Sequence, residues 1–503
     1  MRRGTWKVLL GTMLILTMGT GGLTTAIAAD PDPPAPPTAE EEPPPPPPDE
    51  EETVPETPPA TDADAGPASP ESAGPSTQEL DERLKLLERK DEVAQEQAAE
   101  QAKTAPTVTA GREGVQIRSA DGSTFLRLRG YVQADGQFYT EDDERPTTNT
   151  FLLRRVRPIF EGQVSRYFEF RFMPDFGAGT TVIQDAWMDW KFGSSTRLRA
   201  GKTKVPFGLE RLQSALDILF AVRNAVTNIA PNRDIGLMMT GEPLDGLVNW
   251  SAGIWNGVSD GGSSDTDTGS GKEGSARVFV QPFLRTSSRA FRGFGVGIAA
   301  TYGQNEGTPV TPALAAYRTA GAQTFFNYRS DATATAPATA TGTTVASGRR
   351  KRVSPQMYWS IGRFGLLAEY ARSDQEVTRA PSTTNLTNEA WDAIASFLVT
   401  DDVASYKGVT PKRPFDPGSD GFGAVEIVAR AGAQRQDENS FPFYANPATA
   451  AEVARDRGVG VNWYLSRNAK LMLDYIETRF AGGATGGDRE DERVILNRFQ
   501  VSF

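Results

Sequence analysis

The chain ends in the stretch RVILNRFQVSF, residues 493–503, whose side chains alternate between two faces. One face is apolar apart from Asn497 and carries Ile495, Phe499, Val501 and Phe503. The other face is polar and carries Arg498, Gln500 and Ser502. A strand that separates lipid from a water-filled lumen needs this division. The terminal aromatic residue also resembles the signal by which outer-membrane proteins are recognised for insertion. The stretch therefore predicts a transmembrane β-barrel of a bacterial outer membrane.

The N-terminus has the features of a secretory signal peptide over residues 1–28. Three basic residues precede an apolar run from Val8 to Met18, and Ala26-Ile27-Ala28 supplies the small residues of a cleavage site. No later stretch approaches the ~20 apolar residues that a spanning helix needs. We therefore expect an exported chain that is either soluble or a barrel.

Two residue types are missing, because the chain has no cysteine and no histidine. A disulfide framework, Ser-His-Asp or Cys-His catalysis and most zinc sites are thereby excluded. We expect no enzyme activity, no metal and no cofactor. The carboxylates Asp260, Asp265 and Asp267 form too general a pattern to predict a calcium site.

The net charge of −11 is unevenly distributed. Residues 29–77 hold thirteen Asp and Glu but no Lys or Arg, together with the proline run Pro43–Pro48. Such a segment cannot form a core, so it is predicted to be a disordered, extended spacer. From residue 104 onward the chain is close to neutral, with 45 Lys and Arg against 43 Asp and Glu.

Residues 78–104 predict a short coiled coil. Its heptad core positions are Leu80, Leu84, Leu87, Ala94 and Ala98, with Asp91 at the intervening position. About three heptads are marginal for an isolated helix. The helix therefore either assembles with its copies in a trimer or stays single and solvated.

From about residue 111 the sequence turns to period-two alternation, opened by a hairpin at Asp121-Gly122. Repetition of this pattern without a separate core favours a barrel over a soluble sandwich. We predict a 16-stranded antiparallel barrel over 111–503, with both of its ends on the periplasmic side. The predicted strands are 123–139, 151–164, 166–176, 182–192, 196–204, 234–241, 247–256, 275–284, 292–303, 349–360, 363–375, 388–400, 421–433, 452–465, 469–480 and 491–503. One long connection, 401–420, falls among the short turns, so it either folds into the lumen or marks an error in the count.

The connection from Val205 to Arg233, here named loop 3, is unusually apolar for an outer loop. It contains Leu209, Leu212, Leu216, Ile218, Leu219, Phe220, Val222 and Ile229. This content predicts packing against the inner wall, which would narrow the pore. The Gly, Ser, Thr and Ala content of 257–274 and 304–348 instead predicts mobile outer loops.

The segment GKTKVPFGLERLQSALDILFAVRNAVTNIAPNRDIG, residues 201–236, resembles the phosphate-selective porin O and P family of outer-membrane channels. Further resembling stretches are RRVRPIFEGQVSRYFEFRFMPDFG, IQDAWMDWKF, RPFDPGSDGFGAVEIVAR and GVNWYLSRNAKLMLDY, so that the resemblance covers essentially all of 111–503. It implies a homotrimer of sixteen-stranded barrels that passes small anions by diffusion, in some members phosphate or polyphosphate.

The resemblance also implies an arginine ladder that leads to a constriction, where hydroxyl and basic side chains contact the anion. Ser214 and Arg223 fit the hydroxyl and the arginine of this pattern, and Arg233 fits a further basic position. The chain departs from the pattern at Ala215, where a second hydroxyl is usual, and at Leu216, where a basic residue is common.

Arginine suits oxyanions because its planar fork binds them bidentately and stays protonated. Strand alternation places several arginines on the lumen face, and two lysines lead into loop 3. The candidate anion-binding residues are Arg127, Arg129, Arg155, Arg157, Lys202, Lys204, Arg211, Ser214, Arg223 and Arg233. Pairing with wall carboxylates, which simply keeps the channel wet, is the alternative role of the wall arginines.

The expected partners are small anions and outer-membrane lipid, without nucleic acid. Two alternative functions stay open: a general, weakly selective porin, and a barrel that serves mainly as an envelope tether through its periplasmic spacer and coiled coil.

Overall fold

The computed structural model describes residues 76–503, except 112, 141–146, 194 and 268. The expected signal peptide and the spacer up to residue 75 lie outside the described residues. No helix in the described part is long and apolar enough to cross a membrane.

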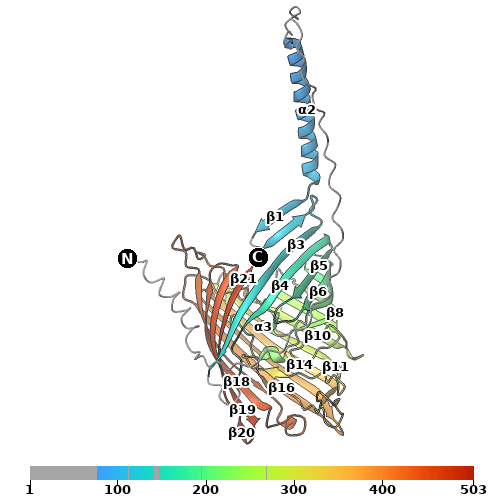
Figure 1. The fold of residues 1–503 in the computed structure, drawn as a ribbon, viewed down its shortest axis with the longest axis vertical. Coiled ribbons are helices and arrows are strands. Elements are labelled where there is room, and N and C mark those ends of the chain that lie inside the picture. Colours follow the sequence, from blue (N-terminus) through green and yellow to red (C-terminus); the bar gives the residue numbers. More distant parts are fainter. Residues whose placement is uncertain (1–75, 112, 141–146, 194, 268) are drawn as a thin grey trace, which may run out of the picture. The chain divides into compact units, whose positions relative to one another are not determined.

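Within the described residues, sixteen antiparallel strands form a closed barrel (Figure 1). It closes because the last strand, β21 (Glu492–Ser502), pairs with the first, β3 (Phe125–Tyr139). The strands between them are β4 (Thr150–Ser165), β5 (Phe168–Asp175), β6 (Val182–Lys191), β7 (Thr196–Lys204), β8 (Arg233–Gly241), β9 (Val248–Trp255), β10 (Glu273–Val280), β11 (Gly293–Glu306), β14 (Val345–Ile361), β15 (Phe364–Arg379), β16 (Ser382–Leu398), β17 (Ala424–Arg435), β18 (Ala451–Tyr464) and β19 (Ala469–Ala484). Each matches one predicted strand, so the predicted barrel and its strand count are confirmed.

The alternation seen in the sequence separates the two faces of the wall. In β21, Arg498 and Gln500 are buried in the barrel, while Phe499 and Val501 are exposed on its outer surface. Since the number of strands is even, β3 begins and β21 ends at the same rim, here named the terminal rim. The opposite rim is named the loop rim.

Shorter elements accompany the barrel. They are the helix α2 (Thr77–Thr104), the hairpin strands β1 (Thr107–Gly111) and β2 (Gly114–Arg118), the single-turn helices α3 (Leu209–Leu212), α4 (Val226–Ile229) and α5 (Arg289–Arg292), the short strands β12 (Tyr317–Arg318), β13 (Thr324–Phe326) and β20 (Gly487–Asp488), and the 3-10 turn η1 (Glu438–Ser440). Strand β2 pairs with the start of β3 through the predicted turn, where Gly122 has a φ of 68°. The sequence pattern did not indicate β1.

Loop 3 folds into the barrel, and it ends one residue earlier than predicted because Arg233 begins β8. Phe207, Ile218, Phe220 and Ile229 are fully buried, and they pack against apolar side chains on the inner wall. Much of the hydrophobic core of this protein therefore lies inside the lumen, between the loop and the wall.

Wall side chains bind the backbone of loop 3. Glu369 of β15 accepts hydrogen bonds from the N–H groups of Leu209 (2.6 Å) and Glu210 (3.2 Å). Asp474 of β19 accepts one from Ala221 at 2.7 Å. Wall acceptors satisfy buried backbone donors at several points along the loop. The inward position of the loop is therefore fixed by specific hydrogen bonds and not by apolar packing alone.

The long connection at the terminal rim, 399–423, also folds inward. Ala404 and Val409 are buried, and the Tyr406 hydroxyl donates a hydrogen bond to the Leu209 carbonyl of loop 3 at 2.7 Å. The predicted strand count was therefore right at this point, and the length of the connection reflects its contact with loop 3.

The expectation of mobile outer loops does not match the structure at 257–274 and 304–348. Tyr317, Phe325 and Phe326 are buried in an aromatic cluster against the inner wall. Asp260 accepts hydrogen bonds from Arg352 (2.6 Å) and the Ser373 hydroxyl (3.1 Å). A few aromatic residues among many small polar ones supply the apolar area that holds 304–348, whereas 257–274 is held by the polar contacts of Asp260.

Candidate functional site

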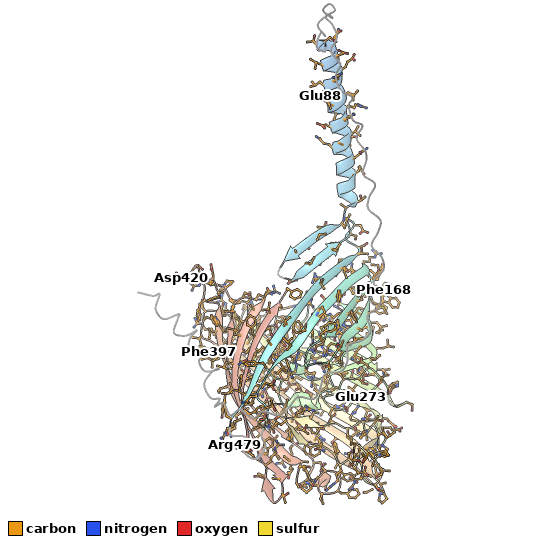
Figure 2. The ribbon with its side chains drawn as sticks, in the orientation of Figure 1. Glu88, Phe168, Glu273, Phe397, Asp420 and Arg479 are labelled. Atoms are coloured by element: carbon orange, nitrogen blue, oxygen red, sulfur yellow. The ribbon has the colours of Figure 1, made fainter. Side chains whose placement is uncertain are left out.

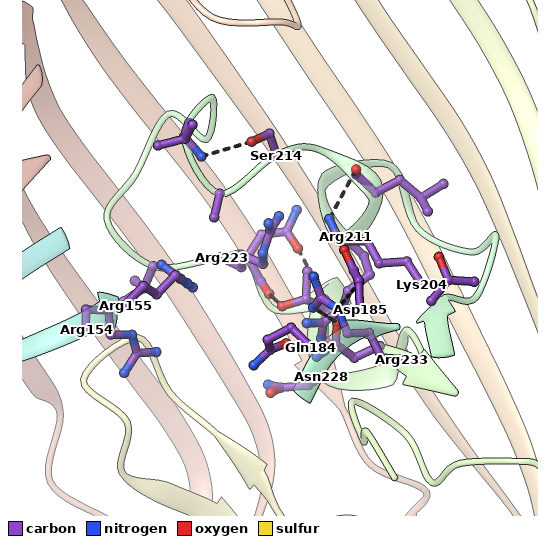
Figure 3. A pocket seen from close by; sticks show the side chains of 18 of the residues that line it. Arg154, Arg155, Gln184, Asp185, Lys204, Arg211, Ser214, Arg223, Asn228 and Arg233 are labelled. Atoms are coloured by element: carbon purple, nitrogen blue, oxygen red, sulfur yellow. Dashed lines mark hydrogen bonds and ion pairs between the residues drawn. The ribbon is translucent and has the colours of Figure 1, made fainter. Parts of the chain in front are cut away.

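The lumen contains a cavity of about 640 Å³ beneath loop 3 (Figure 3). Its walls come from β3 to β10 on one side and from β17 to β19 on the other. Loop 3 and the connection that carries Arg318 complete the lining. The cavity is thus bounded by the barrel wall and by loops that fold into the lumen.

The lining is strongly cationic. Among the described residues, twelve arginines and Lys204 line the cavity, against two carboxylates, Asp185 and Asp456. In a channel, such an excess of one sign of charge favours mobile ions of the other sign.

About half of these cations are neutralised by carboxylates of the wall. The pairs are Arg129 and Arg171 with Glu161, Arg157 with Asp175, Arg199 with Asp189, Arg233 with Asp185 and Arg430 with Asp456. The prediction that some wall arginines pair with wall carboxylates is confirmed for Arg129 and Arg157.

The other cations have no carboxylate partner among the described residues. They are Arg154, Arg155, Lys204, Arg211, Arg223, Arg277 and Arg318. Arg155 donates to the Gln133 side chain at 2.7 Å, and Arg277 donates to the Gln356 side chain at 3.0 Å. Arg154 has neither a hydrogen bond nor an ion pair within the described part of the chain.

A β-bulge explains why two successive arginines line the cavity. Gln133 pairs with Arg155, and Ala134 pairs with Leu153, so that Arg154 is the extra residue in β4. A bulge breaks the alternation of side chains and reverses their phase. Leu153 is therefore exposed on the outer surface, while both Arg154 and Arg155 reach the cavity.

Three cations belong to loop 3 or its base. Lys204 donates to the Gln213 carbonyl at 2.9 Å, and Arg223 donates to the Gln213 carbonyl at 2.9 Å and to that of Glu210. Arg211 donates to the Thr227 carbonyl. These contacts fix the side chains but do not neutralise them.

The charges of loop 3 act on one another. Burial, together with neighbouring Arg223 and Arg233, lowers the pKa of Arg211 to about 9. Burial also lowers the pKa of Arg223. The Nε group of Arg211 is buried without a hydrogen-bond partner. A bound anion would relieve this repulsion and accept from the free donor.

Eight of the ten predicted site residues line the cavity. They are Arg129, Arg155, Arg157, Lys204, Arg211, Ser214, Arg223 and Arg233. Lys202 and Arg127 do not line it: Lys202 pairs with Asp265 of the 256–272 connection, and Arg127 donates to Gln116 of β2 at 2.9 Å. In both cases a segment outside the predicted strand supplies the partner.

Several lining cations were missed. Strict alternation would put the apolar Phe151 and Leu153 on the same face as Arg155 and Arg157. This conflict indicates a bulge between them and could have revealed Arg154 as a lining residue. Arg277 directly precedes the outward-facing Val278 in β10, so strand alternation alone would have placed its side chain on the lumen face. Arg318 lies in a long connection, where no periodicity points to the lumen.

Comparison with known families now identifies the chain. The model of the family described as "Phosphate-selective porin O and P" matches residues 126–503. The chain belongs to this family. It is therefore an outer-membrane porin, a channel rather than an enzyme.

Several solved structures are similar to this porin at low sequence identity. The outer membrane channel DcaP of Acinetobacter baumannii is 12% identical, with a TM-score of 0.50 over 78% of this porin and 100% of that chain. OmpT of Vibrio cholerae is 10% identical, with a TM-score of 0.49 over 76% and 98%. An anion-selective porin from Comamonas acidovorans is 11% identical, with a TM-score of 0.46 over 76% and 100%. None of the curated proteins compared matches this porin.

Proposed function

We propose that this porin passes small anions, phosphate-like ones included, by diffusion through a lumen that loop 3 narrows. The observation that carries the proposal is the set of seven lining cations that have no carboxylate partner in the part of the chain that the structure describes. Paired arginines hold the wall together, whereas unpaired ones are available to a passing ion. Arginine contacts oxyanions bidentately, which suits phosphate better than chloride.

The proposed orientation places the terminal rim in the periplasm and the loop rim outside the cell. It rests on the sequence evidence for export and on the position of both barrel ends at one rim. The loops that fill the lumen then form the outer entrance, and the 399–423 connection lies at the periplasmic exit.

A homotrimer is part of the proposal. The heptad leucines of α2, Leu80, Leu84 and Leu87, are more than half exposed, which is unfavourable for a solitary helix. Deletion of 78–104 should lower the temperature up to which the oligomer persists, with the oligomeric state followed by sedimentation. Single-channel conductance should be retained. An unchanged oligomer would assign the helix another role.

The decisive experiment is planar-bilayer recording of the purified porin, with reversal potentials in a chloride gradient and phosphate as blocker. The double substitution Arg154→Ala, Arg155→Ala should lower anion selectivity and weaken phosphate block by tenfold or more, since two charge-assisted contacts of about 1.5–3 kcal/mol each are removed. Arg127→Ala is the matched control, because this β3 arginine lies outside the cavity.

Three outcomes are informative. The proposal is supported if anion selectivity and phosphate block both fall in the double variant but not in Arg127→Ala. Equal effects of Arg127→Ala would show that only the total charge matters. A large, weakly selective conductance without phosphate block in the unsubstituted porin would make it a general porin.

A further inference from the structure

A second group of arginines lies on the outer surface of the barrel, away from the cavity. Arg455 and Arg457 of β18 are exposed, whereas Asp456 between them is buried. Arg435 of β17 and Arg479 of β19 are also exposed, but each pairs with a carboxylate, Arg435 with Glu452 at 3.9 Å and Arg479 with Asp491 at 3.7 Å. Arg479 and Asp420 lie toward opposite ends of the barrel in Figure 2, and Asp420 belongs to the terminal-rim connection. The arginines therefore gather near the loop rim.

The strand register brings like charges together in this group. Arg455 is the direct cross-strand partner of Arg479. Like charges at directly opposite positions destabilise an antiparallel pair. Arg457 faces Glu477, but the Glu477 carboxylate pairs with Arg479 at 3.1 Å and with Arg493 at 3.4 Å. Two guanidinium groups, those of Arg455 and Arg457, thus make no hydrogen bond or ion pair within the part of the chain that the structure describes.

The same strands become apolar farther from the loop rim. Val459 of β18 is 57% exposed, Ile427 of β17 is 50% exposed and Tyr475 of β19 is 40% exposed. A cationic zone thus adjoins an apolar one on a single continuous surface. This arrangement matches an amphiphile with an anionic headgroup and acyl chains.

The membrane explains why these arginines are tolerated and what neutralises them. An arginine on the lipid-facing surface of a barrel is costly at the bilayer centre but tolerated near the headgroups. Basic clusters at that level bind lipid headgroups, and the planar guanidinium fork suits phosphate oxygens. A phosphate beside Arg455 and Arg457 would supply the negative charge that these two groups lack within the described residues.

We propose that Arg455 and Arg457, with Arg479 and Arg435 beside them, form a binding site for the phosphate headgroup of an outer-leaflet lipid. The acyl chains lie along Val459, Ile427 and Tyr475. The assignment to the outer leaflet rests on the orientation proposed above. The site does not depend on anion conduction, because its side chains point away from the lumen.

The test measures lipid binding to the delipidated full-length porin by native mass spectrometry. The probes are a diphosphorylated lipid A and the same lipid without its phosphates. The unsubstituted porin should retain the diphosphorylated lipid selectively. In the double variant Arg455→Ala, Arg457→Ala, affinity should fall roughly 30-fold, as expected for two arginines near an anionic headgroup.

The matched control is Arg289→Ala, Arg292→Ala, which removes two exposed arginines of α5 at the terminal rim. It should bind the lipid as the unsubstituted porin does. Single-channel conductance shows that each variant is folded, and it is expected to be unchanged in both. Unchanged conductance also separates failure of this site from failure of the conduction proposal.

Four results would overturn the proposal. They are equal binding by the double variant, equal binding of the phosphate-free lipid, capture of inorganic phosphate without retention of the lipid, and a change in oligomeric state without a change in lipid binding. The last result would assign the arginines to a contact between copies of the chain.

Discussion

At the scale of single residues, the partner of a charged side chain decides its role. Arg157 and Arg155 are two positions apart on β4 and both reach the cavity. Arg157 is held by Asp175 at 2.8 Å and by the Tyr131 hydroxyl at 2.8 Å, so it stabilises the wall. Within the described residues Arg155 hydrogen-bonds only the neutral side chain of Gln133 and has no carboxylate partner, so its charge is not neutralised by the wall.

Asp217 of loop 3 gives a pH dependence of stability. Burial raises the pKa of its carboxyl to about 6, although Lys470, Arg467, Lys204 and Lys407 act in the opposite direction. The folded state therefore holds this proton more tightly than the unfolded chain. Stability should fall as the pH rises from about 4 to about 6, and should stay at the lower level above that.

Asp217→Asn should remove this slope and raise the unfolding temperature at pH 7.5. The gain corresponds to at most about 3 kcal/mol, reduced by the partial exposure of the group. The measurement is thermal unfolding in detergent at pH 5 and pH 7.5. Asp401→Asn is the control, because exposed Lys412 and Arg363 lower the pKa of Asp401. Loss of this carboxylate should not raise the unfolding temperature at either pH. A slope that persists in the Asp217 variant would contradict the assignment.

At the scale of elements, loop 3 is held by acceptors on the wall. Glu369 accepts from two backbone N–H groups and from the Asn224 side chain at 2.9 Å. Hydrogen bonds to a charged group contribute about 1.5–3 kcal/mol each. Glu369 thus holds the start of the loop at a fixed place in the lumen.

Glu369→Ala should loosen this anchor. We expect larger and noisier single-channel currents together with lower anion selectivity, because the lining cations of the loop become mobile. Glu369→Gln, which keeps the acceptor oxygen, should restore part of the native behaviour. Glu389→Ala is the control, because this residue of β16 pairs with Arg372 at 3.4 Å and makes no contact with loop 3 among the described residues. Native currents in the Glu369→Ala variant would show that other contacts suffice to hold the loop.

At the scale of the whole molecule, closure of the barrel joins residues more than 350 positions apart. Arg498 of β21 and Asp135 of β3 form two hydrogen bonds, at 2.6 and 2.7 Å, and both side chains are buried. The pair lies on the seam between the first and last strands. Removal of one partner from such a pair leaves an uncompensated buried charge.

Arg498→Ala should destabilise the barrel by about 3–5 kcal/mol. The measurement is the temperature at which the folded form converts to the unfolded form in gel electrophoresis. Arg467→Ala, which breaks the exposed pair with Glu113, should cost about 1 kcal/mol or less. Similar transition temperatures for both variants would mean that the seam is held mainly by its backbone hydrogen bonds.

Much of the architecture follows from local pattern. Alternation and turn signals suffice to place all sixteen strands, because a strand between lipid and water must repeat with period two. The same reasoning places Arg129, Arg155 and Arg157 on the lumen face. It fails at Arg154, where the bulge interrupts the period, and at Arg318, whose two-residue strand β12 is too short to show a period.

The sequence by itself therefore determined the barrel, its strand number and the inward faces of its strands. All three can be read from the local alternation of polar and apolar residues, which repeats every two residues. Only the tertiary structure decided which lining arginines are paired. Ion pairs join strands that are distant along the chain, and their geometry depends on register, bulges and loop packing. For the same reason the unpaired charges of the cavity, and the facing arginines on the outer surface, became visible only once the strands were side by side.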